Sequence, residues 1–432
     1  MSRRRAVVLG GYGLIGSACM RALAGAGFAV TGIGRSHRAA MACDRDADWI
    51  IRDITAVTVF EWRELLEGVD VVVNAAGALQ DGAGDHLDAI HVDAVTALVS
   101  AAEALDLRIV QISAAGVSDH ASTDFFRSKA RGDARVATAR DWVILRPVLV
   151  LSPEAYGGTA LLRAVAALPC IQPRVLPGAR VQTVHVDDLA DAVVHAARGF
   201  IPSGTIADLT EPQGQSFPDL VASIRRWQGF ARPRFTPDLP GALLAAAGRV
   251  ADGLGHLGWR SPLRTTALRA LADGIHGDPD PWQNAGGRPC RSLDATLASL
   301  PATRQERLYA RLYLALPLAI ATLSLFWLLS GIVALIDLRG AIRVLSDRAV
   351  PSWLAGLVAA GGAVADIALG LAILCKPWTR TAALGMAALS VLYLAGGLVF
   401  APDLWADPLG PMVKVLPGIM LALLVWLTTD ER

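Results

Sequence analysis

Four apolar segments in the last third of the chain constrain its fold most strongly. They cover residues 312–336, 353–375, 381–400 and 412–428, each close to the roughly 20 apolar residues that cross a bilayer. Buried core helices of a soluble protein are the alternative, but four such segments in succession leave no polar face to meet water. We therefore predict that residues 304–432 form an all-α transmembrane bundle with four spans, so that the chain is a multi-pass integral membrane protein whose partner is the lipid bilayer.

The orientation of these spans depends on the charges beside them. Lys376 and Arg380 between the second and third segments, and three arginines before the first, favour a cytoplasmic side for those ends, whereas three arginines in the first connection argue the other way. The chain starts MSRRRAVVLG, which passes from arginines directly into a strand-like run, while a secretory signal needs a longer apolar stretch first. We therefore expect a cytoplasmic soluble domain and two cytoplasmic termini.

Residues 1–150 alternate short β-branched runs with amphipathic helical stretches. The runs are nearly continuous in apolar residues, which is typical of parallel strands that are covered on both faces. This alternation predicts an α/β fold, a Rossmann-type doubly wound parallel sheet. The predicted strands are residues 5–10, 29–34, 69–77, 107–114 and 141–147.

Residues 151–303 have a looser pattern, rich in proline, glycine and arginine. We predict that they form a small C-terminal lobe packed at the carboxyl edge of the sheet, where such folds place substrate pockets. The net charge of only +1 argues against a nucleic-acid partner. The five cysteines are scattered and lack metal-ligand spacing, so no metal site is expected.

The sequence VVLGGYGLIG carries the pattern G-x-x-G-x-x-G between a predicted strand and a predicted helix. Glycine lets the backbone turn tightly and approach a pyrophosphate, and the helix then presents its N-terminal amides to that anion. In this context the pattern predicts a dinucleotide-binding loop. Its cofactor-binding residues are Gly10, Tyr12, Gly13, Leu14, Ile15 and Gly16.

The second predicted strand ends in Gly34, Arg35 and Ser36, where NAD-binding proteins usually carry an acidic residue for the ribose 2′-hydroxyl. A carboxylate would repel a 2′-phosphate, while a guanidinium holds one in a bidentate clamp. We therefore expect NADP(H) as the preferred cofactor and NAD(H) as the alternative. Arg35 could instead be an ordinary surface charge, and Arg38 could share the contact.

Two further segments fit the same cofactor. Asp53 follows a strand-like run, and we expect it to meet the adenine amine. At the end of the predicted strand 69–77, small residues would let the backbone pass beside the cofactor ribose. These residues are Asn74, Ala75, Ala76 and Gly77.

Taken in order over residues 5–200, these motifs resemble an atypical or extended short-chain dehydrogenase/reductase, similar to the NAD(P)-binding proteins related to the 39 kDa subunit of respiratory complex I. The apolar segments resemble a DoxX-like membrane module through fragments such as GGAVADIALGLAIL. The resemblance implies an NAD(P)-dependent oxidoreductase or epimerase. The matching pieces are the glycine loop, Asp53, residues 74–77, Ser113, Lys129, residues 145–147 and residues 184–188.

The resemblance also implies catalytic roles and shows one departure. Ser113 would orient the substrate, and Lys129 would hold the nicotinamide ribose. The family carries Tyr-x-x-x-Lys here, but this chain has Phe125 four residues before the lysine, and phenylalanine has no proton to give. General acid–base catalysis is typically worth about 10²–10⁴ in rate, so the departure is serious.

Other groups remain open as proton donors. Ser113, Ser122 and Asp124 are near the expected nicotinamide site, although an aspartate would need a strongly raised pKa. Tyr156 has the required hydroxyl, but we expect it to pack.

Two functions therefore stay open. One is a membrane-anchored oxidoreductase or epimerase that uses NADP(H) on an apolar substrate, such as a quinone or isoprenoid. The other is an assembly or sensor protein of a membrane complex, which binds NADPH without catalysis and would tolerate Phe125. Within the second apolar segment, Asp366 is a candidate for proton or quinone contact, and a structural hydrogen bond to a neighbouring helix is its alternative.

Overall fold

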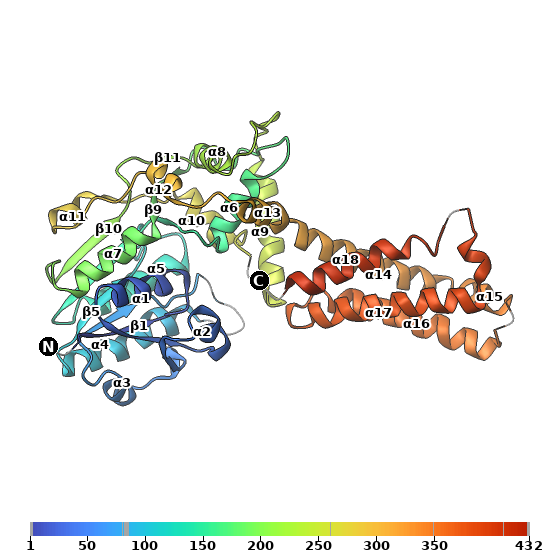
Figure 1. The fold of residues 1–432 in the computed structure, drawn as a ribbon, viewed down its shortest axis with the longest axis horizontal. Helices are drawn as coiled ribbons and strands as arrows, with labels where there is room; N and C mark the ends of the chain where they lie inside the picture. Colours follow the sequence, from blue (N-terminus) through green and yellow to red (C-terminus); the bar gives the residue numbers. More distant parts are fainter. Residues whose placement is uncertain are drawn as a thin grey trace. The chain divides into compact units, whose positions relative to one another are not determined.

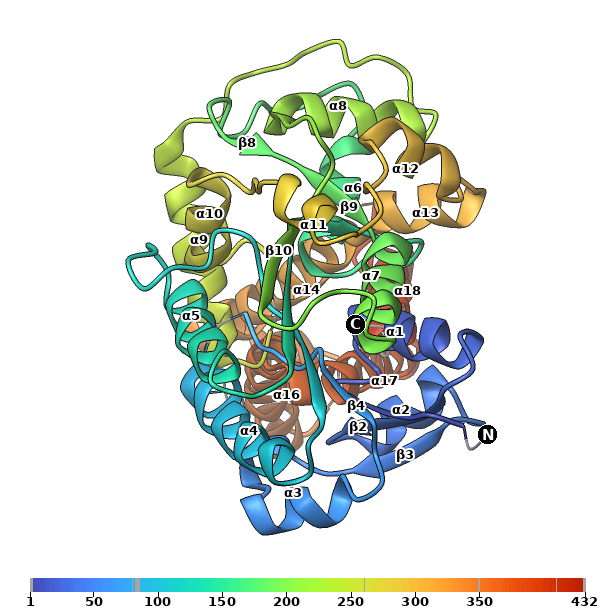
Figure 2. The ribbon, with the colours of Figure 1, turned by 90° about the vertical axis from the view of Figure 1, so that its left-hand side faces the viewer.

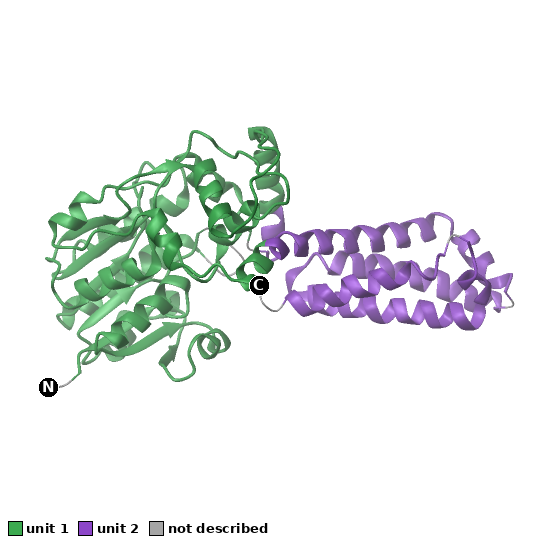
Figure 3. Ribbon diagram, turned by 45° about the horizontal axis from the view of Figure 1, so that its top comes forward, with its two compact units in different colours: residues 1–252, 261–310 green, residues 253–260, 311–432 purple. Residues whose placement is uncertain are grey.

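The computed structural model describes residues 3–79, 81, 86–259, 261–348, 350–408 and 410–429. The chain divides into two compact units (Figure 3). Residues 1–252 and 261–310 form the first unit, and residues 253–260 and 311–432 form the second. The domain limits predicted at residues 150 and 303 stay predictions.

A seven-stranded parallel sheet forms the centre of the first unit (Figure 1). Its strands are β1 (Arg5–Leu9), β2 (Ala29–Gly34), β3 (Asp48–Ile51), β4 (Val71–Asn74), β5 (Arg108–Ile112), β6 (Trp142–Pro147) and β10 (Thr205–Leu209). They lie in the order β10-β6-β5-β4-β1-β2-β3, the doubly wound arrangement in which ligands bind at the carboxyl ends of the strands. The predicted α/β fold class is confirmed. Strand β10 comes from the region predicted as a lobe, and it pairs with β6 in parallel.

Helices cover both faces of this sheet (Figure 2). They are α1 (Leu14–Gly25), α2 (His37–Cys43), α3 (Val59–Leu65), α4 (Ala94–Ala104), α5 (Asp124–Val136) and α7 (Val186–Ala197). Alternate side chains of β1 enter different cores, because successive residues of a strand point to opposite faces. Ala6 and Val8 pack with residues of α1 and α7, while Val7 and Leu9 pack with residues of α3, α4 and α5. This double burial explains why the strands read as continuous apolar runs.

Short elements complete the first unit around a core of their own, which includes Leu162, Leu220 and Leu297. The strands are β7 (Leu149–Leu151), β8 (Arg180–Val181), β9 (Thr183–His185) and β11 (Gln215–Ser216), and the 3-10 and π turns are η1 (Ile54–Ala56) and η2 (Ala89–Asp93). The helices are α6 (Gly157–Ala166), α8 (Phe217–Trp227), α10 (Thr265–Ala272), α11 (Asp280–Asn284) and α12 (Leu293–Ser299). Two more helices, α9 (Gly241–His256) and α13 (Arg304–Tyr313), begin in the first unit, and their last residues belong to the second.

The segment 184–188 has a structural role in this unit. His185 caps α7, with its Nδ1 accepting the backbone N–H of Asp187 at 3.0 Å. Asp188 accepts the backbone N–H of Arg291 at 2.9 Å and its Nε–H at 2.8 Å. The segment therefore joins the start of α7 to a distant loop.

The second unit is a helical bundle. Its elements are α14 (Ala315–Ile336), α15 (Leu338–Ser346), α16 (Ser352–Ala372), α17 (Lys376–Phe400), η3 (Pro402–Trp405) and α18 (Val415–Thr428). Apolar side chains lie both inside it, as with Trp327 at 3% exposure, and on its outer surface, as with Leu318 at 67% and Leu357 at 66%. A helix that is apolar all round suits a lipid environment rather than water.

Among the described residues, three helices are long and apolar enough to cross a membrane by length and composition: residues 304–336, 352–372 and 376–400. The fourth predicted span, 412–428, forms the 14-residue helix α18. At a rise of about 1.5 Å per residue it is about 21 Å long, against about 30 Å of hydrocarbon. The count of four spans is therefore not confirmed, because the turn before α18 shortens the helix.

Gly132 lets α5 pack closely against η2, since a Cβ at this position would stand 2.1 Å from the carbonyl oxygen of His91. We expect Gly132→Ala to destabilise the first unit by about 1–3 kcal/mol through overpacking. The matched control is Gly158→Ala in α6, where a Cβ meets no atom within 4 Å. Thermal unfolding of the purified full chain measures both variants. Equal midpoints for the two would contradict the close contact.

Candidate functional site

The glycine-rich turn lies between β1 and α1 and needs glycine at Gly10 and Gly16. Gly10 has φ +71°, a left-handed conformation that other residues rarely adopt. Its N–H donates to the carbonyl of Ile33 at 2.9 Å, and its own carbonyl accepts the N–H of Gly13 at 2.9 Å. A Cβ at Gly16 would stand 2.1 Å from the Gly10 carbonyl oxygen. The backbone geometry thus agrees with the sequence pattern.

The first turn of α1 is open for an anion. Gly13 precedes the helix without a capping side chain, and the first turn contains no acidic residue. The amides of Leu14, Ile15 and Gly16 belong to this turn, whose N–H groups have no partner within the helix. Together with the positive end of the helix dipole, they form a site that suits a phosphate group.

The loop after β4 lies against this turn. A Cβ at Gly10 would stand 2.9 Å from the Cα of Ala76. Buried Asn74 shapes the loop, because its Nδ2 donates to Gln111 Oε1 at 2.9 Å and its Oδ1 accepts the N–H of Ala76 at 3.2 Å. The structure therefore brings residues 74–76 beside the glycine turn, and their contact with a cofactor stays a prediction.

The residues predicted for the adenosine end lie after the neighbouring strands. Tyr12 packs on the end of β2, where a Cβ at Gly34 would stand 2.2 Å from its ring. Arg35 follows β2 and is exposed, as is Arg38 at the start of α2. Asp53 follows β3 and caps η1, accepting the N–H of Thr55 at 3.0 Å. Their roles toward adenine and the 2′-phosphate stay predictions.

Lys129 and His91 lie beside Gly77, and the Phe125 ring lies near both of them. A Cβ at Gly77 would stand 3.7 Å from Lys129 Nζ and 3.3 Å from His91 Nε2. Lys129 is buried; its Nζ donates to the carbonyl of Ile112 at 3.1 Å and lies 5.8 Å from the centre of the Phe125 ring. Burial lowers the pKa of Lys129, while the charge of Asp133 opposes that shift. The cation is thus held at the edge of the loop that would pass the cofactor ribose.

His91 is a member of this cluster that the sequence analysis missed. It lies in η2 and is buried; its Nε2 accepts the N–H of Ala78 at 3.3 Å, and its Nδ1 lies 2.8 Å from Ser128 Oγ. Since Nε2 accepts, Nδ1 carries the proton and donates to Ser128, whose hydroxyl is 3.0 Å from the carbonyl of Phe125. Burial, and then the charge of Lys129, lower the His91 pKa to about 3. The one signal in the sequence was a histidine between two β-branched apolar residues, Ile90 and Val92, in a helical segment.

Ser113 lies in a second buried network. Its Oγ donates to Asp133 Oδ2 at 2.7 Å, and Arg146 donates to the same oxygen from Nε at 3.2 Å and from Nη2 at 3.0 Å. Burial raises the pKa of Asp133, while the bond from Ser113 and the charges of Arg146 and Lys129 act against that shift. Asp133 follows Lys129 by one helical turn, a spacing that the sequence analysis left unused. The role of Ser113 toward a substrate stays a prediction.

The other candidate proton donors, Ser122, Asp124 and Tyr156, lie outside the network of Ser113 and Asp133. Ser122 donates a hydrogen bond to Asp273, and Asp124 pairs with Arg127 on an exposed part of α5. Tyr156 is 64% exposed, so the expectation that it packs is wrong. It stands just before α6, whose first residue is Gly157, at the surface rather than in a core.

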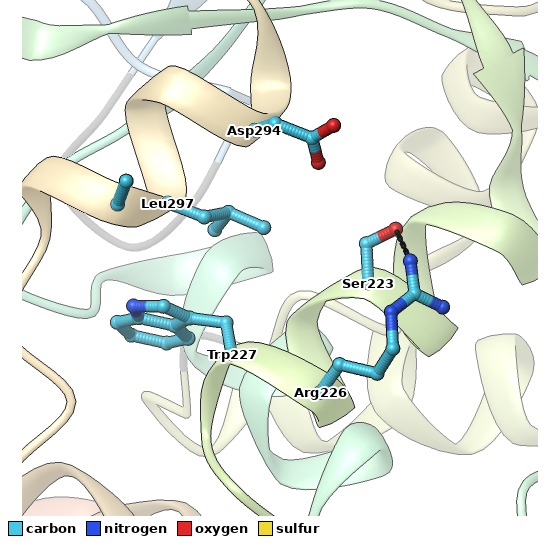
Figure 4. A pocket seen from close by; sticks show the side chains of 6 residues that line it. Ser223, Arg226, Trp227, Asp294 and Leu297 are labelled. Carbon is cyan, nitrogen blue, oxygen red and sulfur yellow. Dashed lines mark hydrogen bonds between the residues drawn. The ribbon is translucent and has the colours of Figure 1, made fainter.

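A small hollow of about 240 Å³ lies between α8 and α12 (Figure 4). It carries charges of both signs, Arg226 and Asp294, and Ser223 accepts a hydrogen bond from Arg226 at 3.0 Å. The hollow shares no residue with the glycine turn or with the group formed by Lys129, Phe125 and His91. The remaining lining residues are Trp227, Leu297 and Ala298.

Two family models match separate parts of the chain. Residues 6–204 match the NAD dependent epimerase/dehydratase family, and residues 324–424 match the DoxX-like family. A search of curated proteins finds no match. The resemblance to an NAD(P)-binding short-chain dehydrogenase/reductase with a DoxX-like module is confirmed at this level. The narrower likeness to the 39 kDa subunit group stays a prediction.

Solved structures of similar fold cover most of the first unit. The Bordetella bronchiseptica enzyme WbmG in complex with NAD is 16% identical, over 69% of this chain and 92% of that chain, with a TM-score of 0.52. UDP-glucose 4-epimerase from Thermotoga maritima is 15% identical, over 72% and 99%, with a TM-score of 0.51. An epimerase from Methanothermobacter thermautotrophicus is 14% identical, over 72% and 94%, with a TM-score of 0.53. At these identities the likeness shows the fold alone.

The lowered pKa of His91 predicts a specific pH dependence of stability. The neutral ring is favoured in the folded state, so its contribution is present above the unfolded pKa of about 6.5 and is lost as the pH falls toward about 3. The loss is at most about 1.4 kcal/mol per pH unit in that window. Between about pH 7 and pH 5, we expect the free energy of unfolding of His91→Asn to change less with pH than that of the parent chain.

Calorimetry of the purified full chain at several pH values measures this difference. His120→Asn is the matched control, because His120 is an exposed histidine outside the cluster. The same pH dependence in the parent and in His91→Asn would contradict the buried neutral imidazole.

Proposed function

We propose that this chain, which joins an NAD-dependent epimerase/dehydratase-like domain to a DoxX-like membrane domain, binds NADP(H) and is an oxidoreductase or epimerase for an apolar or membrane-associated substrate. A quinone or isoprenoid represents that substrate class. One observation carries the proposal: the uncapped N-terminus of α1 follows a turn that only glycine can form, and the loop after the adjacent strand β4 leads to Lys129. This arrangement suits a pyrophosphate at one end and a nicotinamide ribose at the other.

The preference for NADP(H) rests on Arg35. The residue follows the carboxyl end of β2, where a carboxylate would otherwise favour the ribose 2′-hydroxyl of NAD. Arg35 is an exposed residue, and Arg38 at the start of α2 adds a second positive charge. A 2′-phosphate in this position would gain charge-assisted hydrogen bonds that NAD(H) does not make.

We expect Arg35→Ala to weaken NADPH binding by about tenfold or more, because a charge-assisted contact to the 2′-phosphate is lost. NADH binding should change little. Titration of the detergent-purified full chain, followed by nucleotide fluorescence, measures both affinities. Arg63→Ala, which removes an exposed arginine from α3, is the matched control. An equal loss for both nucleotides would contradict the phosphate contact, and binding of neither by the parent would contradict the cofactor proposal.

Phe125 favours a second candidate function, that of an assembly or sensor protein that binds NADPH without catalysis as part of a membrane complex. Phe125 lies one helical turn before Lys129 and its ring lies near the lysine Nζ. A tyrosine at this position would be the proton donor. A ligand that binds only the folded state would stabilise it by about 2.7 kcal/mol at 100 times its dissociation constant. NADPH could therefore control the folding or docking of the domain.

Phe125→Tyr distinguishes the two functions. If the parent chain transfers hydride, we expect it to oxidise NADPH slowly with a short-chain quinone as probe, and the added hydroxyl to raise that rate by up to about 10²–10⁴. The adjacent Phe126→Tyr is the control, since its ring lies against Phe125 and not over Lys129. Absorbance of NADPH follows the reaction. Binding without turnover in the parent, with turnover in Phe125→Tyr, would favour the sensor function.

The arrangement in the membrane is also part of the proposal. We place the soluble domain in the cytoplasm and treat the chain as multi-pass. Lys376 and Arg380 at the start of α17 support a cytoplasmic position for that end of the bundle.

A further inference from the structure

Among the described residues of the second unit, one carboxyl group is buried inside the helical bundle. Asp366 of α16 is 5% exposed. Its Oδ2 accepts a hydrogen bond from Ser330 Oγ of α14 at 2.8 Å, and its Oδ1 accepts one from Tyr393 Oη of α17 at 2.8 Å. Three helices that are separate in sequence thus converge on one carboxyl group.

Glycines next to these residues make the contacts possible. A Cβ at Gly362, four residues before Asp366, would stand 2.9 Å from Tyr393 Oη. A Cβ at Gly331, which follows Ser330, would stand 2.5 Å from the carbonyl oxygen of Ala363 and 3.1 Å from Asp366 Cβ. Both hydroxyl groups therefore reach the carboxyl group through gaps that larger residues would close.

No cation in these helices balances Asp366. It is the one acidic or basic residue of α14, α16 and α18 together, all of whose residues are described. In α17, Lys376 and Arg380 lie at the start of the helix, and Tyr393 is 13 or more residues further, about 20 Å at a rise of 1.5 Å per residue. A charge without a counter-ion in hydrocarbon costs several kcal/mol, which hydroxyl donors offset only in part. Asp366 is therefore a candidate to take up a proton within the membrane domain.

The carboxyl group lies inside the bundle, and one of its partners reaches the flank. Asp366 lies 14 residues after Ser352 and 6 before Ala372, about 21 Å and 9 Å from the two ends of α16. Tyr393 is 36% exposed on the flank of the bundle while its hydroxyl touches the carboxyl group. The phenol thus connects the buried oxygen to the outer surface.

We propose that Asp366, Tyr393 and Ser330 form a proton-exchange site within the membrane domain, so that this domain carries a proton-linked activity in addition to anchoring the chain. In the ionised state both hydroxyl groups donate to the carboxylate. Uptake of one proton converts the carboxylate to a carboxylic acid, whose O–H donates to a hydroxyl oxygen that previously donated to it. Release reverses this exchange, and only O–H bonds form or break.

Infrared difference spectroscopy of the full chain in phosphatidylcholine nanodiscs tests the proposal. We expect a protonated-carboxyl band that shifts in D₂O and that titrates with pH while the chain stays folded. Asp366→Asn should remove the band. Asp347→Asn, which replaces an exposed carboxylate outside the spans, should leave it unchanged.

Two milder variants keep the carboxyl group and test its partners. Tyr393→Phe removes one hydroxyl, and Gly362→Ala displaces it; both should shift the frequency of the band and slow its exchange in D₂O. A band that neither exchanges nor titrates would mean that Asp366 is a structural hydrogen-bonding group, which would overturn the proposal. So would the absence of a protonated band that depends on Asp366 across the whole pH range.

Discussion

The backbone contact at Gly10 is the constraint on which the candidate site depends. Its N–H donates a hydrogen bond to the carbonyl of Ile33 in β2, and its carbonyl accepts one from the N–H of Gly13, just before α1. Its Cα lies against the loop after β4, where an added Cβ would stand 2.9 Å from the Cα of Ala76. Three segments thus meet at one residue with φ +71°. Because a side chain cannot fit there, the loop after β4 can lie directly against the glycine turn at the carboxyl ends of the central strands.

Burial then decides the chemistry next to that surface. Lys129 and His91 lie together beside Gly77, where loss of water lowers the pKa of both groups. The imidazole is neutral and holds the backbone of Ala78, so it acts on the shape of the loop. The Phe125 ring covers the ammonium group and contributes no proton. The arrangement is compatible with the proposed contact to a ribose, and proton transfer there would depend on other groups.

The two units solve the problem of a buried charge differently. In the first unit, Asp133 is surrounded by Ser113, Arg146 and Lys129, so cations and hydroxyl groups both compensate for lost hydration. In the bundle, Asp366 has hydroxyl partners, and the two cations of α17, Lys376 and Arg380, lie 13 or more residues before its partner Tyr393. A paired charge stabilises a fixed geometry, whereas an unpaired one is left responsive to a proton.

The sequence by itself determined the parts that depend on local pattern: the parallel strands, the glycine turn and the long apolar helices. Continuous apolar runs, glycine spacing and segment length act within a few residues of the chain, so they are visible before folding. Tertiary structure decided the rest. His91 meets Ser128, and Asp366 meets Ser330 and Tyr393, across separations of 27 to 37 residues. Strand β10 forms through its parallel pairing with β6, and α18 is shorter than the apolar segment that contains it. Such contacts follow from packing between distant elements, which no local pattern specifies.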